Sequence, residues 1–437
     1  MTAGEKSPQD PARMRRVLGP VELTASGVGI IIGAGIYVLL GAATAEAGAA
    51  VWASFALAAI LCGLTGLSYA ELASMFPNAG AEYDYTRRVF PDRWAFVVGW
   101  MMATGLMVAA AAIATGFAHY LRYFVDVPVV LAAVALLAIE TGIALSGMRR
   151  SARVALTLSA LQVAGLIFVV AIGIPHFGSE SLVAGSTTGG VLSGAALVFF
   201  AFIGFDEVIT MAEETENPTR VVPRALLLAL GISTVLYVAV AVAAVSVIGA
   251  SALADSPRPL TDVMAHVLGG RAGSSVAVIA LISTTNTSLL ALTAGSRLLY
   301  GMADTGALPR AWAKLSAKSQ VPSTAIVVVA SGAMGFAVVG DLTLIASVTN
   351  FAVYVVFLAV NATVIVLRYR AADQPRPFRI PGAIGRLPLA PVAGFAAAAL
   401  MLPQLDRTAV LWGLALVATG AVAHDLLRPR STRDSAT

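Results

Sequence analysis

The sequence predicts an all-α integral membrane protein, and three observations support this: the composition, the recurrence of long apolar segments and the placement of the basic residues. Of the 437 residues, 58% are hydrophobic and 12% are charged, against about 45–50% and about 25% in soluble domains. Apolar segments recur along the whole chain, and about 20 such residues suffice for a helix to cross the hydrocarbon layer. The single cysteine, Cys62, excludes a disulfide framework.

Twelve apolar segments are bounded by charge, proline or glycine. In chain order, the predicted transmembrane helices are 22–45, 48–75, 94–121, 128–147, 153–174, 191–213, 224–249, 272–301, 323–340, 342–368, 387–404 and 408–427. The segment before the first helix is polar and basic and lacks the apolar core of a signal peptide. We therefore expect cytoplasmic tails at 1–21 and 428–437.

The basic residues provide a test of this segmentation. Twelve crossings place both termini on one side, and 24 of the 28 Lys and Arg residues then fall on that side. The opposite side carries only Arg122, Arg258, Arg271 and Arg407. Because basic residues collect in cytoplasmic loops, we predict a multi-pass protein of the cell membrane with both termini in the cytoplasm. The basic residues form no single patch, so no nucleic-acid partner is expected.

Two predicted helices, the first and the sixth, have sequences at their middles that permit a break. These are Gly29–Tyr37 and Phe199–Glu207. A glycine inside a helix costs about 1 kcal/mol relative to alanine, and freed backbone groups are tolerated in a bilayer only where they line a protein cavity. The two positions correspond if the chain consists of two five-helix units, the second inverted. Alternatively, the glycines allow close helix packing.

Paired breaks of this kind suit a zwitterionic ligand. Amides freed in the first helix would lie at the N-terminus of its second half, where the helix dipole attracts a carboxylate. Carbonyls freed in the sixth helix would accept hydrogen bonds from an ammonium group. The pattern therefore predicts a binding site for a molecule of amino-acid size.

Three ordered motifs resemble the amino acid, polyamine and organocation superfamily of permeases, with the closest pattern in cationic-amino-acid-transporter-like and archaeal permeases. They are Ile32-Gly33-Ala34-Gly35-Ile36; Phe202-Ile203-Gly204-Phe205-Asp206 with the following Glu213 to Arg224; and Ser296 to Asp304 with Leu308-Pro309. The resemblance covers nearly the whole chain. It implies a leucine-transporter-like fold of five plus five inverted helices with broken helices 1 and 6, comprising repeats 22–174 and 191–368 and two additional helices in 387–427.

The resemblance also implies a set of binding residues, without a cofactor or a metal. The amides of Gly33, Ala34 and Gly35 would hold the substrate carboxylate. The carbonyls of Ile31, Phe200 and Ile203 would hold its amine. Phe202 and Phe205 are candidates for a gate or a pocket wall, although aromatic residues in membrane helices also serve plain packing.

Four further residues are candidates for coupling transport to an ion. Asp206 is a carboxylate at membrane depth, which is costly and therefore a functional hypothesis by default; the alternative is that it is a structural partner of the neighbouring backbone. A role for Glu207 is less expected, because the motif of the resembled family is satisfied without it. Ser151-Ala152-Arg153-Val154 resembles the start of helix 5 in these permeases, in which a lysine nine positions beyond the arginine can exchange protons. Gln162 stands at that position here, so either a neutral contact replaces that lysine or protons act elsewhere. Ser283 and Thr284 would line a sodium-like site, or they are ordinary interhelical hydrogen-bonding residues.

These features predict a secondary active transporter of neutral or broad-range amino acids that works by alternating access, with exchange or proton coupling. The alternative within the same superfamily is a transporter of polyamines or other organic amines. A channel would not need paired broken helices. An enzyme is not expected, because the four histidines are far apart in sequence and no cluster of His, Asp and Glu has catalytic or metal-binding spacing.

Overall fold

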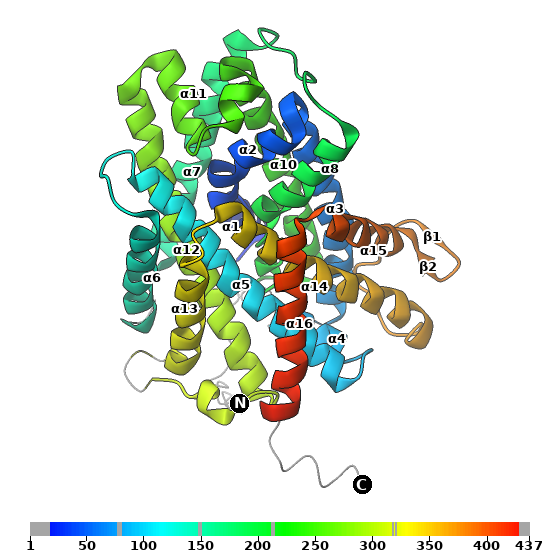
Figure 1. Ribbon diagram of the computed structural model, residues 1–437. Coiled ribbons are helices and arrows are strands. Elements are labelled where there is room, and N and C mark those ends of the chain that lie inside the picture. Colours follow the sequence, from blue (N-terminus) through cyan, green and yellow to red (C-terminus); the bar gives the residue numbers. More distant parts are fainter. Residues whose placement is uncertain are drawn as a thin grey trace, which may run out of the picture.

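The computed structural model describes residues 18–76, 81–146, 151–210, 215–316, 319 and 321–427. Most of the predicted N-terminal tail, the whole C-terminal tail, and Glu213 and Glu214 of the second motif lie outside these residues. The described chain is almost entirely helical, with a single two-stranded sheet. Figure 1 shows the helices gathered in one bundle.

The helices agree closely with the predicted segments. The α-helices are α1 Pro20–Ile31, α2 Ala34–Ala47, α3 Val51–Met75, α4 Ala81–Thr86, α5 Asp92–Leu121, α6 Val129–Ser146, α7 Ser151–Gly173, α8 Thr188–Val198, α9 Glu207–Thr210, α10 Pro218–Ala254, α11 Pro259–Leu268, α12 Gly270–Asp304, α13 Ser323–Ala337, α14 Leu342–Arg370, α15 Leu389–Met401 and α16 Arg407–Leu427. The 3₁₀ turns are η1 Gly48–Ala50, η2 Ile174–His176, η3 Phe199–Phe202, η5 Arg310–Ala313 and η6 Leu402–Gln404. Strands β1 Ala383–Ile384 and β2 Leu387–Pro388 form an antiparallel hairpin.

Several helix ends follow from local chemistry. The Thr187 hydroxyl accepts a hydrogen bond from the Gly190 amide at 3.0 Å and caps α8. The Asp341 carboxylate accepts one from the Leu344 amide at 3.0 Å and caps α14. These side chains satisfy amides that a helix start leaves unpaired. Gly340, with φ of 72°, makes the tight turn between α13 and α14, so the short predicted junction at this glycine is present.

Nine helical segments among the described residues are long and apolar enough to cross a membrane. One of them, Ala34–Met75, contains both α2 and α3 with the turn at Gly48 between them. Three shorter apolar helices, α1, α13 and α15 with η6, accompany these segments. The described chain is therefore almost entirely helical and has the apolar helices of a multi-pass membrane protein.

Both predicted helix breaks are present. α1 ends at Ile31 and α2 begins at Ala34, so only two residues separate them. α8 ends at Val198, and η3 with a turn through Gly204 separates it from α9. Gly204 has φ of 107°, a conformation that favours glycine. Gly29, in contrast, lies inside α1, and a Cβ on it would stand 2.5 Å from the Cβ of Ser159, so this glycine serves close helix packing.

Both breaks lie inside the bundle, since Ile31, Ile32, Ala34, Phe200 and Phe202 are buried. α1 packs against α7 and α10, whereas α5 packs against α12 and α14. The two broken helices are also linked away from the breaks. Leu18, two residues before α1, forms a parallel β-bridge with Thr215, five residues after α9. The Glu216 amide donates to the Leu18 carbonyl at 3.0 Å. The two chain segments that flank the breaks are thus held together at that end.

Candidate functional site

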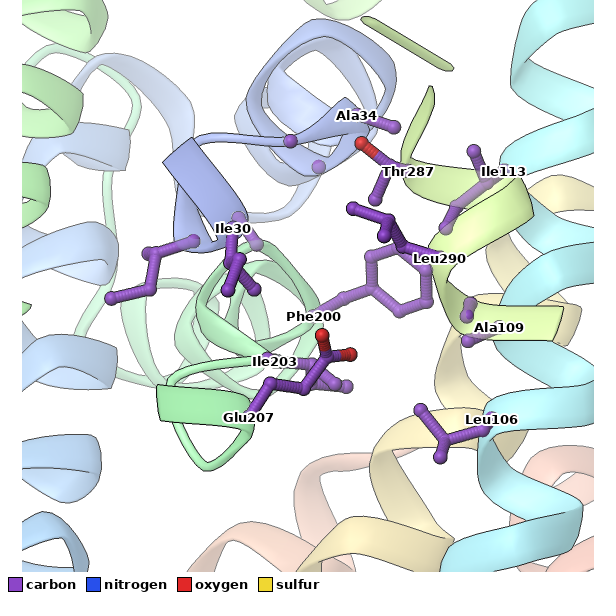
Figure 2. Close-up of a pocket in the computed structure, with 16 residues that line it drawn as sticks. Ile30, Ala34, Leu106, Ala109, Ile113, Phe200, Ile203, Glu207, Thr287 and Leu290 are labelled. Atoms are coloured by element: carbon purple, nitrogen blue, oxygen red, sulfur yellow. The ribbon is translucent and has the colours of Figure 1, made fainter. Parts of the chain in front are cut away.

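A cavity lies between the two helix breaks and is closed on its other side by α5 and α12. The cavity has a volume of about 40 Å³, which is enough for a few water molecules. Figure 2 shows the side chains that surround it. The lining residues are Ile30, Ile31, Gly33, Ala34, Gly35, Leu106, Ala109, Ile113, Phe200, Ala201, Ile203, Gly204, Glu207, Thr287, Leu290 and Ala291.

Six of the eight predicted binding residues line this cavity: Ile31, Gly33, Ala34, Gly35, Phe200 and Ile203. They come from both breaks, which places predicted donors and acceptors around one space. Gly33 is the N-cap of α2, and no side chain caps that helix start. The first amides of α2, like those of every helix, have no acceptor within their own helix.

The other two predicted binding residues, Phe202 and Phe205, do not line the cavity. Both are fully buried in the packing behind it. The ring of Phe202 lies 5.2 Å from that of Tyr237. The ring of Phe205 lies 5.6 Å from those of Tyr69 and Phe357. In this conformation both phenylalanines are packing residues, and a gating role for either stays a prediction.

The acceptor side of the cavity is partly occupied by the protein itself. The Ile31 carbonyl accepts from the Gly33 amide at 2.8 Å and from the Tyr237 hydroxyl at 2.6 Å. The same hydroxyl lies 3.0 Å from the Ala201 carbonyl in the second break. A carbonyl oxygen has two lone pairs, so an ammonium group would reach Ile31 only by displacing one of these donors. Sequence reasoning missed Tyr237, because it lies on a helix distant in sequence from both breaks.

Of the two adjacent carboxylates, Glu207 lines the cavity and Asp206 does not, and a coupling role for either stays a prediction. Asp206 is buried outside the cavity, and its carboxylate accepts a hydrogen bond from the Gly204 amide at 3.2 Å, which stabilises the turn. Glu207 lines the cavity and, as Figure 2 shows, directs its carboxylate toward Phe200. It is the only Asp or Glu among the cavity residues that the structure describes.

The remaining coupling candidates, Gln162, Ser283 and Thr284, do not line the cavity. Gln162, on α7, is fully buried, and neither its amide oxygen nor its amide nitrogen has a hydrogen-bond partner among the described residues. Its backbone carbonyl accepts from the Tyr37 hydroxyl at 3.1 Å. On α12, the Ser283 hydroxyl is likewise buried and without a partner in the described part of the chain. The Thr284 hydroxyl donates to the Ala280 carbonyl at 2.8 Å, an ordinary helical hydrogen bond.

Thr287 is a second residue that the sequence reasoning missed. It lies one turn after Ser283 on α12, its hydroxyl donates to the Ser283 carbonyl at 2.9 Å, and it lines the cavity. A Cβ on Gly33 would stand 2.7 Å from this hydroxyl oxygen. The helical spacing from Ser283 was the available signal, because residues four apart lie on the same face of a helix.

Comparison with known proteins supplies the remaining observation. The sequence profile of the family described as amino acid permease matches residues 18–422. The chain is 31% identical to the branched-chain amino acid permease BcaP of Bacillus subtilis, over 87% of this chain and 86% of that protein. It is 30% identical to the methylthioribose transporter of the same organism, over 84% of each chain. It is also 30% identical to the vacuolar cationic amino acid transporter 4 of Arabidopsis thaliana, over 83% of this chain and 65% of that protein.

Proposed function

Because the chain belongs to the amino acid permease family, whose members are transporters and not enzymes, we propose that it moves amino acids across the cytoplasmic membrane by alternating access. We propose twelve transmembrane helices with both termini in the cytoplasm. The repeats would be 22–174 and the inverted 191–368, followed by two additional helices in 387–427. The pairing of breaks in α1–α2 and α8–α9 supports this arrangement.

The observation that carries the proposal is the cavity between the two breaks. It brings the first amides of α2, which no side chain caps, and the backbone of the second break to one space. Amides at a helix start favour a carboxylate, and the proposed role of Gly33, Ala34 and Gly35 is to bind it. The Gly33 amide would first have to leave the Ile31 carbonyl to which it donates. Phe200 and Ile203 would direct their carbonyls to the amine, with Ile31 joining once the Tyr237 hydroxyl withdraws.

The side-chain part of the cavity supports a neutral, apolar substrate. Leu106, Ala109 and Ile113 of α5 and Leu290 of α12 form an aliphatic wall. An aliphatic side chain gains about 25 cal/mol for each Å² of apolar surface buried there. The branched-chain substrate in the name of the Bacillus subtilis relative agrees with such a wall.

A second candidate substrate class, a cationic amino acid or a polyamine, is favoured by one residue. Glu207 places a carboxylate in the cavity, where it would attract an additional amine. The vacuolar relative from Arabidopsis thaliana is named for cationic amino acids. In Glu207→Gln, uptake of arginine and putrescine would then be lost while uptake of leucine persisted, whereas equal loss of all three would exclude this selectivity role.

The buried neutral side chain at Gln162 supports exchange without a proton. A lysine there would lose its proton readily when desolvated, but an amide has no charge to exchange. In Gln162→Lys, we expect uptake to become pH-dependent, and Gln162→Met controls for the loss of the amide. If wild-type uptake already depends on a proton gradient, Asp206 or Glu207 would be the carrier instead.

The test of the function uses the purified chain in liposomes loaded with unlabelled amino acids. Entry of radiolabelled leucine, arginine and putrescine is followed with and without an imposed pH gradient. Saturable leucine entry that requires internal amino acid supports the proposed exchanger. Entry of putrescine alone would contradict the carboxylate site at Gly33 to Gly35, and no entry of any of them would contradict the substrate class.

A further inference from the structure

A second cavity lies away from the helix breaks, at the end of α14 and the loop that follows it. Its volume is about 400 Å³, ten times that of the cavity between the breaks. Its lining is strongly basic and consists of Arg368, Ala372, Asp373, Gln374, Arg376, Arg379 and Arg386. We call it the arginine pocket. It shares no lining residue with the cavity between the breaks.

Two of its arginines are fixed by a buried carboxylate from α3. The Glu71 carboxylate accepts from Arg368 Nε at 2.8 Å and from Arg376 Nε at 3.2 Å, and also from the Ile380 amide at 2.9 Å. The side chains of Arg368 and Arg376 are only 3% and 7% exposed. A single carboxylate thus holds two guanidinium groups and neutralises one charge, leaving one positive charge in this buried group.

One donor in this group has no acceptor. The Nη1 atom of Arg368 is buried and has no hydrogen-bond partner within the described chain, although Arg368 lines the arginine pocket. All three nitrogens of the Arg376 guanidinium have acceptors, Glu71 and four backbone carbonyls. An unpaired buried donor on a charged group is costly, so Arg368 indicates where an anion would be received.

The outer wall of the pocket adds charge that is not neutralised. Arg379 and Arg386 are exposed and form no ion pair in the described part of the chain. Arg386 stands in the two-residue turn of the β1–β2 hairpin, where Gly385 has φ of 64°. With Glu71 and Asp373 counted against the four arginines, the pocket retains a net charge of +2.

The surroundings place the arginine pocket at the edge of the membrane. The hairpin directly precedes the apolar helix α15 and extends from the bundle beside it (Figure 1). Ile384 at the hairpin is 71% exposed and Leu389 at the start of α15 is 44% exposed. Apolar side chains next to clustered arginines match the boundary between acyl chains and headgroups.

We propose that the arginine pocket binds a phosphate group, supplied by the headgroup of an anionic phospholipid. Guanidinium groups bind phosphate through paired N–H donors, and several arginines together favour it over a single carboxylate. Arg368 Nη1 provides the inner donor, and Arg379 and Arg386 provide the outer ones. Free inorganic phosphate offers the same chemistry and is the other source to be distinguished.

The experiment measures the melting temperature of the purified full chain in uncharged detergent. Phosphatidylglycerol, phosphatidylcholine and sodium phosphate are titrated separately, with sodium chloride at equal ionic strength as the reference. The test variant is Arg379→Gln with Arg386→Gln, which leaves the Glu71 cluster intact. The matched control is Arg220→Gln with Arg224→Gln, two exposed arginines at the start of α10 that change the net charge equally.

The expected result is a rise in melting temperature with phosphatidylglycerol but not with phosphatidylcholine. The half-saturating concentration should increase about tenfold in the test variant, equivalent to about 1.4 kcal/mol, and should stay unchanged in the control. If sodium phosphate alone gives the same arginine-dependent rise, the site is confirmed with free phosphate as its ligand. Equal responses of wild type and test variant, or no response to either anion, would overturn the proposal.

Discussion

Gly35 and Ala201 bring the backbones of the two broken helices into direct contact. A Cβ atom on Gly35 would overlap the Cα of Ala201 and stand 2.6 Å from its Cβ. Contacts to Cβ atoms are never this short, and the obstructing atom belongs to the main chain and cannot rotate away. Gly35 is therefore required for the two breaks to meet.

Gly35→Ala should abolish uptake and lower stability by several kcal/mol, since one break has to move away from the other. Gly63→Ala is the matched control, because a Cβ there meets only Leu230 Cδ2 at 3.9 Å and alanine is the better helix former by about 1 kcal/mol. Melting temperature and leucine uptake are measured for both. Normal uptake by Gly35→Ala would show that the breaks do not need this contact.

Tyr237→Phe removes the hydroxyl that lies between the Ile31 and Ala201 carbonyls. We expect a loss of about 1 to 2 kcal/mol in stability, the usual effect of removing a buried hydrogen bond, seen as a lower melting temperature. Tyr123→Phe is the control, because its hydroxyl donates to the Gly270 carbonyl at an exposed position. If both variants melt alike, the hydroxyl does not stabilise the junction of the breaks.

The buried cluster around Glu71 should matter far more for stability than a surface ion pair. Glu71→Gln leaves two buried arginines without their counter-ion, and we expect a loss of about 3 to 5 kcal/mol. Asp425→Asn breaks the pair with Arg93, whose side chains are 55% and 53% exposed, and should cost less than about 1 kcal/mol. Unfolding in denaturant measures both, and similar losses would refute the distinction.

Stability should also depend on pH through Glu82 in the short helix α4. Burial, with a smaller effect of the Asp206 carboxylate, raises the pKa of Glu82 above the usual range for a glutamate, and the Tyr69 hydroxyl donates to it at 2.9 Å. An acid whose pKa is higher in the folded chain stabilises the fold below the unfolded pKa of about 4.3. That contribution is lost as the pH rises through the folded value.

The melting temperature should therefore fall as the pH is raised from about 4.5 toward 8. Glu82→Gln should flatten this dependence, because a glutamine stays neutral throughout. Asp84→Asn, two residues away on the same short helix, controls for a change of charge in α4. A slope in Glu82→Gln as steep as that of the wild type would assign the pH effect to other groups.

The membrane helices could be predicted from the sequence because the thickness of the lipid bilayer sets the length of each apolar segment. Gly340, for example, marks the turn before α14, and Ile31 and Ala34 end and begin helices within the predicted break. The choice between Asp206 and Glu207 could not be made in this way. They follow the non-helical turn at Gly204, and helical periodicity cannot be extended through a segment that is not helical.

Contacts between segments that are distant in the sequence could not be predicted either. Nothing near Tyr237 indicates that its hydroxyl meets Ile31, because that contact depends on how α10 packs against α1. The same holds for Phe202 and Phe205, whose aromatic character suits a pocket wall and a packed interior equally. Their placement behind the cavity depends on the rotation of the chain within η3 and the turn that follows.

The bridge between Leu18 and Thr215 determines how a force or an attachment at this end of the chain would act on the protein. It makes the stretch of chain entering the first broken helix and the stretch leaving the second a single mechanical tether. A pull applied at residue 18, by a fusion partner or a surface attachment, would be transmitted to the backbone on both sides of the cavity between the breaks. Reporter groups are therefore safer at a distance from this end, and force applied there in a single-molecule experiment would act on the transport machinery directly.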